Sequence, residues 1–464
     1  MAAGRLRSAL IALSVLCLAS CIHYSPKPLP PGRAVTDFGA RTLEDPALRA
    51  DLDKALPSHA GQWPRADWNR ADLLIAMLHF NDTVAEGRAA VNVATAGQRT
   101  AREYPNPSVT LASEYANQHD GSPLWLWGIA TDWLLDFGTR RDDRIAAAGL
   151  GVQQARYDFT ELTWKSRSSL RKSLADLLIT NSEVTLLETN HADRESQLTM
   201  ARRQLELGAA ARGEVDRLVS DALLDEQKLN DARRRSSAAR SSLASALGVP
   251  VAALEQVHLV WDHLDDPPEP PTEVLRQWRG DALLVRADVR SAVIGYSLTE
   301  QALRLEVARQ YPEVHLGPGY TWDHGVKRLQ FNLGLTLPFV NRNRGAIAEA
   351  EARREQAGAR LEATVASAYS EIDEAIRQWR LARTRLTEAH GAIYDSAQRI
   401  YSETQRGFDA GSNDRTELLA AKIARTLTEL QVLDAVRGAQ DALASLEDAL
   451  RRPLEGPEVA INEK

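Results

Sequence analysis

The segment RLQFNLGLTLP, Arg328 to Pro338, alternates between apolar and polar or small residues. Gln330, Asn332, Gly334 and Thr336 fall on one side of it. The apolar side chains fall on the other side: Leu329, Phe331, Leu333, Leu335 and Leu337. Because side chains of a β-strand point alternately to its two faces, this pattern predicts a strand with one apolar face and one wet, small-residue face.

Three other segments share this alternation: Val109–Tyr115, Trp125–Leu135 and Val314–Trp322. Together the four predict two hairpins, at about 107–136 and 313–339. The strands have about the length that a tilted strand needs to cross a bilayer, and aromatic residues lie toward their ends, as in an interfacial girdle. We therefore expect a lipid-facing set that comprises Leu329, Phe331, Leu333, Leu335, Trp125, Trp127, Trp133, Tyr320 and Trp322.

A strand of a soluble β-sandwich alternates in the same way, so one segment alone would not indicate a membrane. The chain, however, offers too few strands for a sandwich, and Pro318 lies on an apolar strand face. Four strands cannot close a barrel, and open sheet edges are not tolerated in lipid. Three chains with four strands each would supply a barrel of twelve strands.

Most of the remaining sequence predicts helix. From Gly345, about 60 residues show a seven-residue repeat of apolar residues: Val365, Ile372, Trp379, Leu386, Ile393 and Ile400. A second seam, from Leu361 to Ser396, consists mostly of alanine and lets helices approach closely. A sustained repeat of seven predicts a left-handed coiled coil. A matching long helix is expected from about Asp142 to Leu207, and each long helix returns through a shorter one.

The chain also reads as a tandem repeat. At an offset of 207, Tyr104-Pro105 aligns with Tyr311-Pro312. At an offset of 203, Gly208, Arg212 and Glu214 align with the second-copy residues Gly411, Arg415 and Glu417. The predicted fold class is an α+β membrane protein with an internal duplication, in which a trimeric β-barrel continues into a long α-helical coiled-coil barrel.

The predicted domain organisation follows from these patterns. It comprises a signal peptide (1–20), an extended proline-rich arm (21–65), a first repeat with its tip at about 206–214 (66–250), a proline-rich linker (251–273), a second repeat with its tip at about 407–417 (274–453) and a tail (454–464).

The signal peptide consists of Arg5 and Arg7, an apolar run and the box Leu18-Ala19-Ser20-Cys21. Cys21 resembles the acceptor of a bacterial lipoprotein, which carries diacylglycerol on its thiol and an amide-linked acyl chain. Ordinary signal cleavage near the same place is the alternative. Residue 22 is Ile22 rather than aspartate, which favours the outer membrane by resemblance to sorting rules.

Composition excludes several other classes of function. The formal net charge is −7, and it becomes −9 when Arg5 and Arg7 are removed, which argues against a nucleic-acid partner. We find no catalytic triad, phosphate loop or zinc-binding helix motif, so we predict no enzyme and no cofactor beyond the covalent lipid. The pairs His119-Asp120 and Asp323-His324 are weak metal candidates, and we predict no metal site.

The lipobox, the duplicated hairpins between long helices, YPNP, LPFVNRNRGAIAEAEA and the paired tips together resemble the TolC-like outer membrane efflux channels. This resemblance covers roughly residues 65–453 and implies a homotrimer with a twelve-stranded barrel in the outer membrane and a periplasmic helical tunnel. It also implies a periplasmic adaptor protein and an inner-membrane transporter as partners.

Channels of this family carry acidic residues just after the tip glycines, and here the matching positions hold Glu417 and Glu214. We expect Asp414 to belong to the same aperture set, and with Asp409 and Arg415 it could also contact the adaptor or lock a closed state through ion pairs. Three Glu417 carboxylates around one constriction would select cations. The alternative is that Glu417 completes a capping box with Asp414 and that Glu214 favours a helix start. A second acid one turn later in the family is replaced here by Ala420, so a two-tier gate is not supported.

Other tip residues are expected to shape the turns or to contact the adaptor: Gly208, Arg212, Gly411, Arg415 and Asp409. Two rival functions remain open, namely the outer membrane component of a type I protein-secretion system and a lipid-anchored periplasmic scaffold without a pore. The sequence does not indicate the cargo.

Overall fold

The computed structural model describes residues 24–56, 63–115, 117, 124–136, 138–323 and 325–458. The chain divides into two units, Met1–Thr42 and Leu43–Lys464. The predicted signal peptide and Cys21 lie outside the described residues, as do His119, Asp120 and His324.

The prediction of an extended arm over residues 21–65 is wrong at residues 31–39 and 46–55, which are helical. The first unit contains helix α2 (Pro31–Gly39), and the second unit begins with α3 (Pro46–Ala55). Each helix has proline in its first turn, where the missing N–H is tolerated. Asp45 caps α3 by accepting a 2.7 Å hydrogen bond from the N–H of Ala47.

The second unit contains two similar series of elements. The first series is α3, β1 (Asp67–Trp68), α4 (Arg70–Phe80), α5 (Asp82–Arg102), β2 (Ser108–Tyr115), β3 (Trp125–Leu135), α6 (Arg140–Glu206) and α7 (Arg212–Leu247). A short 3₁₀ turn (Val251–Leu254) and β4 (His258–Leu259) follow. The second series is α8 (Thr272–Val285), α9 (Ala287–Ala308), β5 (Glu313–Asp323), β6 (Val326–Thr336), α10 (Arg344–Glu388), a π turn (Ala389–Ile393), α11 (Tyr394–Asp409) and α12 (Arg415–Leu450).

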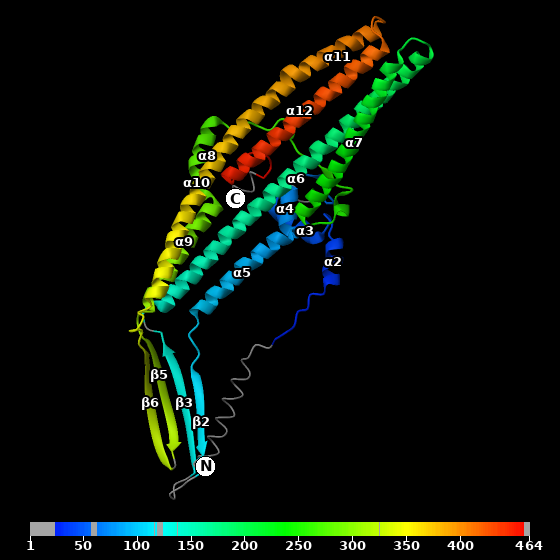
Figure 1. Ribbon diagram of the computed structural model, residues 1–464. Helices are drawn as coiled ribbons and strands as arrows, with labels where there is room; N and C mark the ends of the chain where they lie inside the picture. Colours follow the sequence, from blue (N-terminus) through cyan, green and yellow to red (C-terminus); the bar gives the residue numbers. More distant parts are fainter. Residues whose placement is uncertain are drawn as a thin grey trace. The chain divides into compact units, whose positions relative to one another are not determined.

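The four long strands form one antiparallel sheet in the order β2-β3-β5-β6. The central pair, β3 and β5, joins the two hairpins, so the sheet unites both halves of the second unit. Within that unit the sheet lies at one end of α5, α6, α9 and α10, whereas the α6–α7 and α11–α12 turns lie at the opposite end (Figure 1). The α6 helix alone has 67 residues, or about 100 Å.

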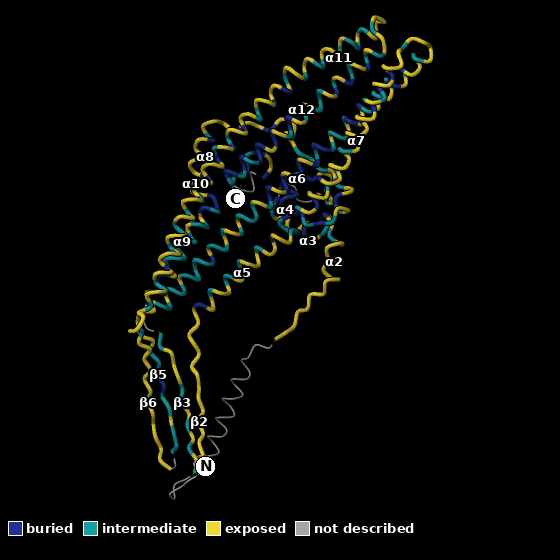
Figure 2. Tube along the Cα trace, in the orientation of Figure 1, coloured by how far each residue is buried: buried dark blue, intermediate teal, exposed yellow. Residues whose placement is uncertain are grey.

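The apolar core lies midway along the helices and is organised around α6. Leu170, Leu174 and Leu177 of α6 pack into one cluster with α3, α4 and α7. Ala175 and Ile179 pack into a second cluster with α8, α10 and α12. Figure 2 shows the buried residues gathered at this level, while the sheet and the helix tips are mostly exposed or half-buried. One helix thus belongs to both cores.

The predicted heptad seam is only partly buried. Ile372, Trp379 and Leu386 are at most 1% exposed, but Ile393 and Ile400 are 46% and 55% exposed. The prediction of one regular helix from Gly345 did not anticipate the π turn at Ala389–Ile393. A π turn inserts an extra residue and rotates the following helix, and the seam is exposed beyond it. Val365, which precedes the π turn, is also 37% exposed, so the buried part of the seam is confined to its middle.

No helix in the described part of the chain is long and apolar enough to cross a membrane.

Trp379→Ala tests the packing of the second core. The indole is 1% exposed, so its removal should lower the free energy of unfolding by about 3–5 kcal/mol through lost burial and a cavity. Thermal unfolding of the purified protein measures this change. Leu381→Ala is the matched control, since Leu381 is 72% exposed on the same helix. Equal effects of the two substitutions would contradict the assigned core.

Candidate functional site: the sheet faces and the helix tips

The register of the sheet places the nine predicted lipid-facing residues on a single face. Trp127 lies opposite Trp322, and Tyr320 lies opposite Leu329. Trp133 and Leu333 both lie opposite Leu316. Directly opposed residues of neighbouring strands point to the same face, so the apolar alternation continues across all four strands.

This apolar face is exposed in the single chain. Leu329 is 88% exposed, Phe331 74% and Trp127 55%. Trp125 stacks on Trp127 with ring centroids 5.6 Å apart, and Tyr115 lies 5.0 Å from Trp125. Contiguous exposed apolar surface of this kind marks a site that something else covers. Lipid contact by this face stays a prediction.

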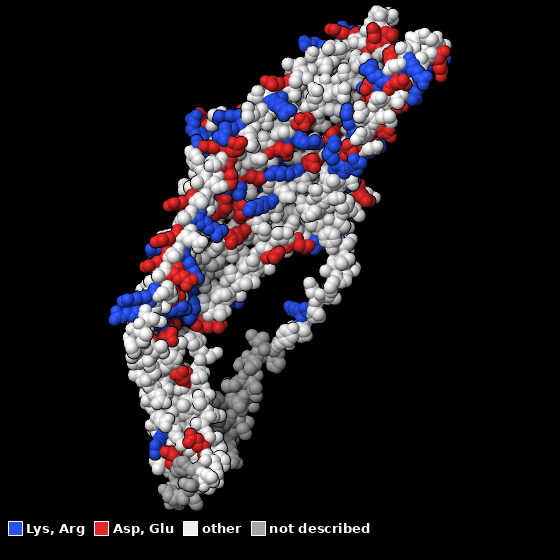
Figure 3. Space-filling model, viewed as in Figure 1, with Lys and Arg blue, Asp and Glu red and all other residues white. Residues whose placement is uncertain are grey.

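The opposite face of the sheet is mostly polar or small, and its large apolar residues are Leu126, Leu134 and Val326 near the strand ends. Four glycines lie on it, namely Gly128, Gly317, Gly319 and Gly334, together with Thr321, Gln330 and Asn332. The view in Figure 3 shows few charges over the sheet, in contrast to the mixed charges over the helices. A sheet with one apolar and one small polar face has the chemistry of a wall between lipid and water.

The two helix tips share one turn geometry. Gly208 and Gly411 have φ angles of +74° and +76°, a left-handed conformation that glycine adopts without a steric penalty. The N–H of Ala209 donates to the carbonyl of Gln204, and the N–H of Ser412 donates likewise to Gly407. These glycines therefore supply turn geometry, as expected.

The capping box predicted for the second tip is present. The N–H of Glu417 donates to Asp414 at 2.7 Å, and the N–H of Asp414 donates to the Glu417 carboxylate at 3.2 Å. Glu417 is nevertheless exposed. The capping reading thus holds in the single chain, while a role for Glu417 in an aperture stays a prediction.

The first tip has no equivalent box, since Ala211 occupies the cap position of α7. Glu214 lies exposed in the first turn of α7, and Arg212 begins that helix. At the second tip, Asp409 accepts a 2.9 Å hydrogen bond from Gln405, and Arg415 begins α12. The described residues show no hydrogen bond or ion pair that joins one tip to the other.

A buried ionic cluster midway along the helices escaped the sequence analysis. Arg167 and Arg171 of α6 pair with Glu447 of α12, and Arg171 and Glu447 are 2% and 0% exposed. Burial alone would lower the pKa of Arg167, but Glu447 and Glu458 outweigh it and hold that pKa above its ordinary value. The cluster thus joins α6, α12 and the C-terminal segment.

The same cluster extends to α4 through Arg70. Arg70 donates to Glu455 at 2.9 Å, and its guanidinium lies 4.3 Å from the ring centroid of Trp261. Gly456 has a φ angle of +80°, a conformation that favours glycine, and a Cβ there would also meet this guanidinium. In the sequence, the only pattern that could have indicated this cluster is a pair of arginines four residues apart on one helix face, Arg167 and Arg171. Their carboxylate partners lie hundreds of residues away in the sequence.

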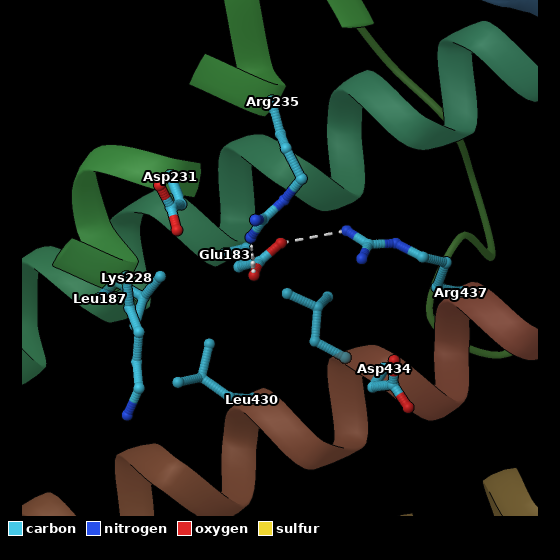
Figure 4. A pocket seen from close by; sticks show the side chains of 9 residues that line it. Glu183, Leu187, Lys228, Asp231, Arg235, Leu430, Asp434 and Arg437 are labelled. Carbon is cyan, nitrogen blue, oxygen red and sulfur yellow. Dashed lines mark hydrogen bonds and ion pairs between the residues drawn. The ribbon is translucent and has the colours of Figure 1, made fainter. Parts of the chain in front are cut away.

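A smaller polar contact joins the helices nearer the tips. A cavity of about 210 Å³ lies between α7 and α12, with Leu187 of α6 among its apolar lining residues (Figure 4). Glu183 of α6 lies within 2.6 Å of Arg235 on α7 and within 3.1 Å of Arg437 on α12. One carboxylate therefore connects the α6–α7 hairpin to α12.

These features define a class of structure: long helical hairpins continued by an incomplete four-stranded sheet with one apolar face. Residues 278–450 match the family model described as outer membrane efflux protein. Outer membrane protein OprJ of Pseudomonas aeruginosa is 27% identical over 190 residues, which are 40% of this chain and 39% of OprJ. This match therefore spans about two fifths of the length of that relative.

The fold extends the similarity over most of the chain. The outer-membrane channel OprN has a TM-score of 0.68 at 15% identity, covering 93% of this chain and 98% of OprN. VceC, an outer membrane protein of Vibrio cholerae, has a TM-score of 0.67 at 16% identity, covering 83% and 97%. The predicted resemblance to TolC-like outer membrane efflux channels is confirmed.

Glu447→Gln tests the buried ionic cluster. Without the negative charge of Glu447, the positive charges of Arg167 and Arg171 are no longer balanced in a buried site. The free energy of unfolding should therefore fall by about 3–5 kcal/mol. Glu349→Gln is the control, because Glu349 pairs with Arg353 on the same helix, both side chains are more than 60% exposed, and its removal should cost at most about 1 kcal/mol. A loss for Glu447→Gln no larger than the control's would contradict the structural role of the cluster.

Asp414→Ala tests the cap at the second tip. The loss of the side-chain acceptor should destabilise the first turn of α12 by about 1 kcal/mol. Since exchange follows the opening of this turn, its amides should exchange roughly fivefold faster. Hydrogen exchange monitored at Glu417 and Leu418 measures this change. Asp414→Asn keeps an acceptor and should exchange nearly as slowly as the wild type. Unchanged exchange in Asp414→Ala would show that the capping box does not hold the turn.

Proposed function

We propose that this protein is the outer membrane exit duct of a tripartite efflux pump. It conducts substrates passively from an inner-membrane transporter and a periplasmic adaptor to the exterior. The observation that carries this proposal is the sheet, whose register places a continuous apolar set on one face and mostly small or polar residues on the other. The match to the efflux protein family and the similarity to outer-membrane channels support it.

The duct is a homotrimer in this proposal. A single chain has four long strands, with β2 and β6 at the edges of its sheet. Three copies joined edge to edge close a twelve-stranded barrel in which no backbone group faces lipid unpaired. The lipid-facing set then contacts the outer membrane, and the glycine-rich face lines the pore. Acyl chains on Cys21 would anchor the protein in the same membrane.

The long helices form the periplasmic part of the duct. The α11–α12 turn narrows it where three copies of Glu417 come together, and a ring of carboxylates there selects cations. Arg212, Arg415 and Asp409 lie at the tips, where they are placed to contact the adaptor. Opening consists of a rearrangement of the tip helices, and the transporter does the work.

A scaffold without a pore is less well supported. It gives no reason for a continuous apolar sheet face with Leu329 and Phe331 exposed on it. The protein-secretion alternative shares the duct architecture and differs only in cargo.

Single-channel conductance in a planar bilayer tests the duct directly. The wild type should show a small, cation-selective conductance, which grows and loses selectivity in Glu417→Ala. Glu417→Gln separates charge from capping, because it keeps a side chain that can reach the N–H of Asp414. Selectivity should fall in Glu417→Gln as well. A folded, lipid-embedded protein without conductance in any form would contradict the duct.

If the pore persists but Glu417→Gln leaves its selectivity unchanged, Glu417 acts only as a helix cap. Such a result would leave the duct in place and remove the carboxylate ring from its mechanism.

A further inference from the structure

One histidine lies on the small polar face of the sheet and pairs with a carboxylate. Nδ1 of His315, on β5, lies 3.0 Å from Oδ2 and 3.3 Å from Oδ1 of Asp132, on β3. Their side chains are 34% and 50% exposed. The pair is therefore formed across two strands and remains accessible to water.

The register explains why these two side chains meet. His315 lies directly opposite Leu134 on one side and Gly334 on the other. Asp132 is two residues from Leu134 on the same strand, which makes it a diagonal neighbour of His315 on the same face. Gly334 has no side chain to cover the imidazole from the β6 side, so the pair lies open on the polar face.

The other acids near this end of the face are paired differently. Glu313, two residues before His315, pairs with Arg140 at 3.0 Å. Asp136, just beyond β3, has its carboxylate 3.9 Å from Arg144. An arginine keeps its charge at every accessible pH, so these two pairs remain neutral overall. Asp132 has a histidine where the neighbouring acids have arginines.

The charged groups that face this part of the sheet from its other elements are few. On β6 the residues beside His315 are Gly334 and Asn332, neither of which titrates. On β2, Ser108 lies opposite Asp132. Farther along the same face, Asp323 pairs with Arg328 at 2.8 Å, and Glu114 lies near the end of β2.

We propose that His315 and Asp132 form a proton-binding site on the pore wall that sets the ion selectivity of the duct according to pH. This inference rests on the proposed function, in which the polar face of the sheet lines the pore. With a neutral imidazole the pair carries one negative charge, and after one proton binds to His315 the pair is neutral overall. Three copies of the pair change the wall from three negative charges to none.

The change in charge on the pore wall is large enough to alter the concentration of ions inside the pore. In water, one unit charge about 10 Å away changes the local concentration of a monovalent ion roughly twofold. Histidine is the side chain whose ordinary charge change falls between about pH 5 and about pH 8. The preference for cations over anions should therefore fall as the pH is lowered through this range.

Reversal potentials across a planar bilayer with a potassium chloride gradient, recorded at about pH 8 and about pH 5, test the inference. The wild type should be more cation-selective at the higher pH. His315→Gln should keep the same cation selectivity at both pH values, because the carboxylate remains and the proton site is gone. Asp132→Asn should lower cation selectivity at both pH values.

A matched control comes from a second histidine–aspartate pair, which lies outside the four-stranded sheet, on the short paired strands β1 and β4. His258 lies 2.7 Å from Asp67, and both side chains are largely exposed. His258→Gln should therefore behave as the wild type. Repeating the series in a Glu417→Gln background removes any contribution from the tip carboxylates.

Two results would overturn the inference in distinguishable ways. A conductance whose pH dependence survives unchanged in His315→Gln would remove the proton site and leave the duct intact. The absence of conductance from every form, with a folded protein in the bilayer, would remove the duct and the pore-wall site together.

Discussion

The sheet has two open edges, and this constraint governs the rest of the structure. Within the described chain β2 and β6 have a strand neighbour on one side only, and the apolar face between these edges is exposed. Unpaired backbone groups are costly in lipid, and apolar side chains are costly where they face water. Association of copies edge to edge would satisfy the backbone, and lipid would cover the face. The proposed trimer in a membrane would both pair the edge strands and cover the apolar face.

The helices, in contrast, bury most of their core side chains and pair their buried charges within one chain. α6 contributes to both apolar cores, and the cluster around Arg171 and Glu447 ties it to α12 and the C-terminal segment. Nearer the tips, contacts between the hairpins become polar, as at Glu183. Beyond the π turn, the described part of α11 buries no residue. The two large apolar clusters thus lie midway along the helices. Near the first tip a small cluster around Leu198 and Leu218 packs α6 against α7, whereas α11, which leads to the second tip, buries no described residue.

Sequence patterns predicted the parts of this structure that depend on local periodicity. Alternation with a period of two identified the strands, because this signal lies within a few residues. The match of the Gly208 segment to the Gly411 segment, at an offset of 203, identified both tips. The N-terminal arm was misjudged because its prolines suggested extended chain, whereas Pro46 starts a helix. Neither the Arg171–Glu447 pair nor the His315–Asp132 pair could be predicted. Each depends on a long-range register between elements, which the pattern of either element alone does not encode.

The central claim is that one sheet face contacts lipid while the other lines water, and spin-label accessibility tests it most directly. Single cysteines at consecutive positions 328 to 335, labelled in bilayers, would be exposed in turn to oxygen and to a water-soluble nickel relaxant. Accessibility to oxygen should peak at 329, 331, 333 and 335, and accessibility to nickel should peak at the intervening positions. Uniform accessibility to nickel along the whole strand would contradict the claim and place both faces in water.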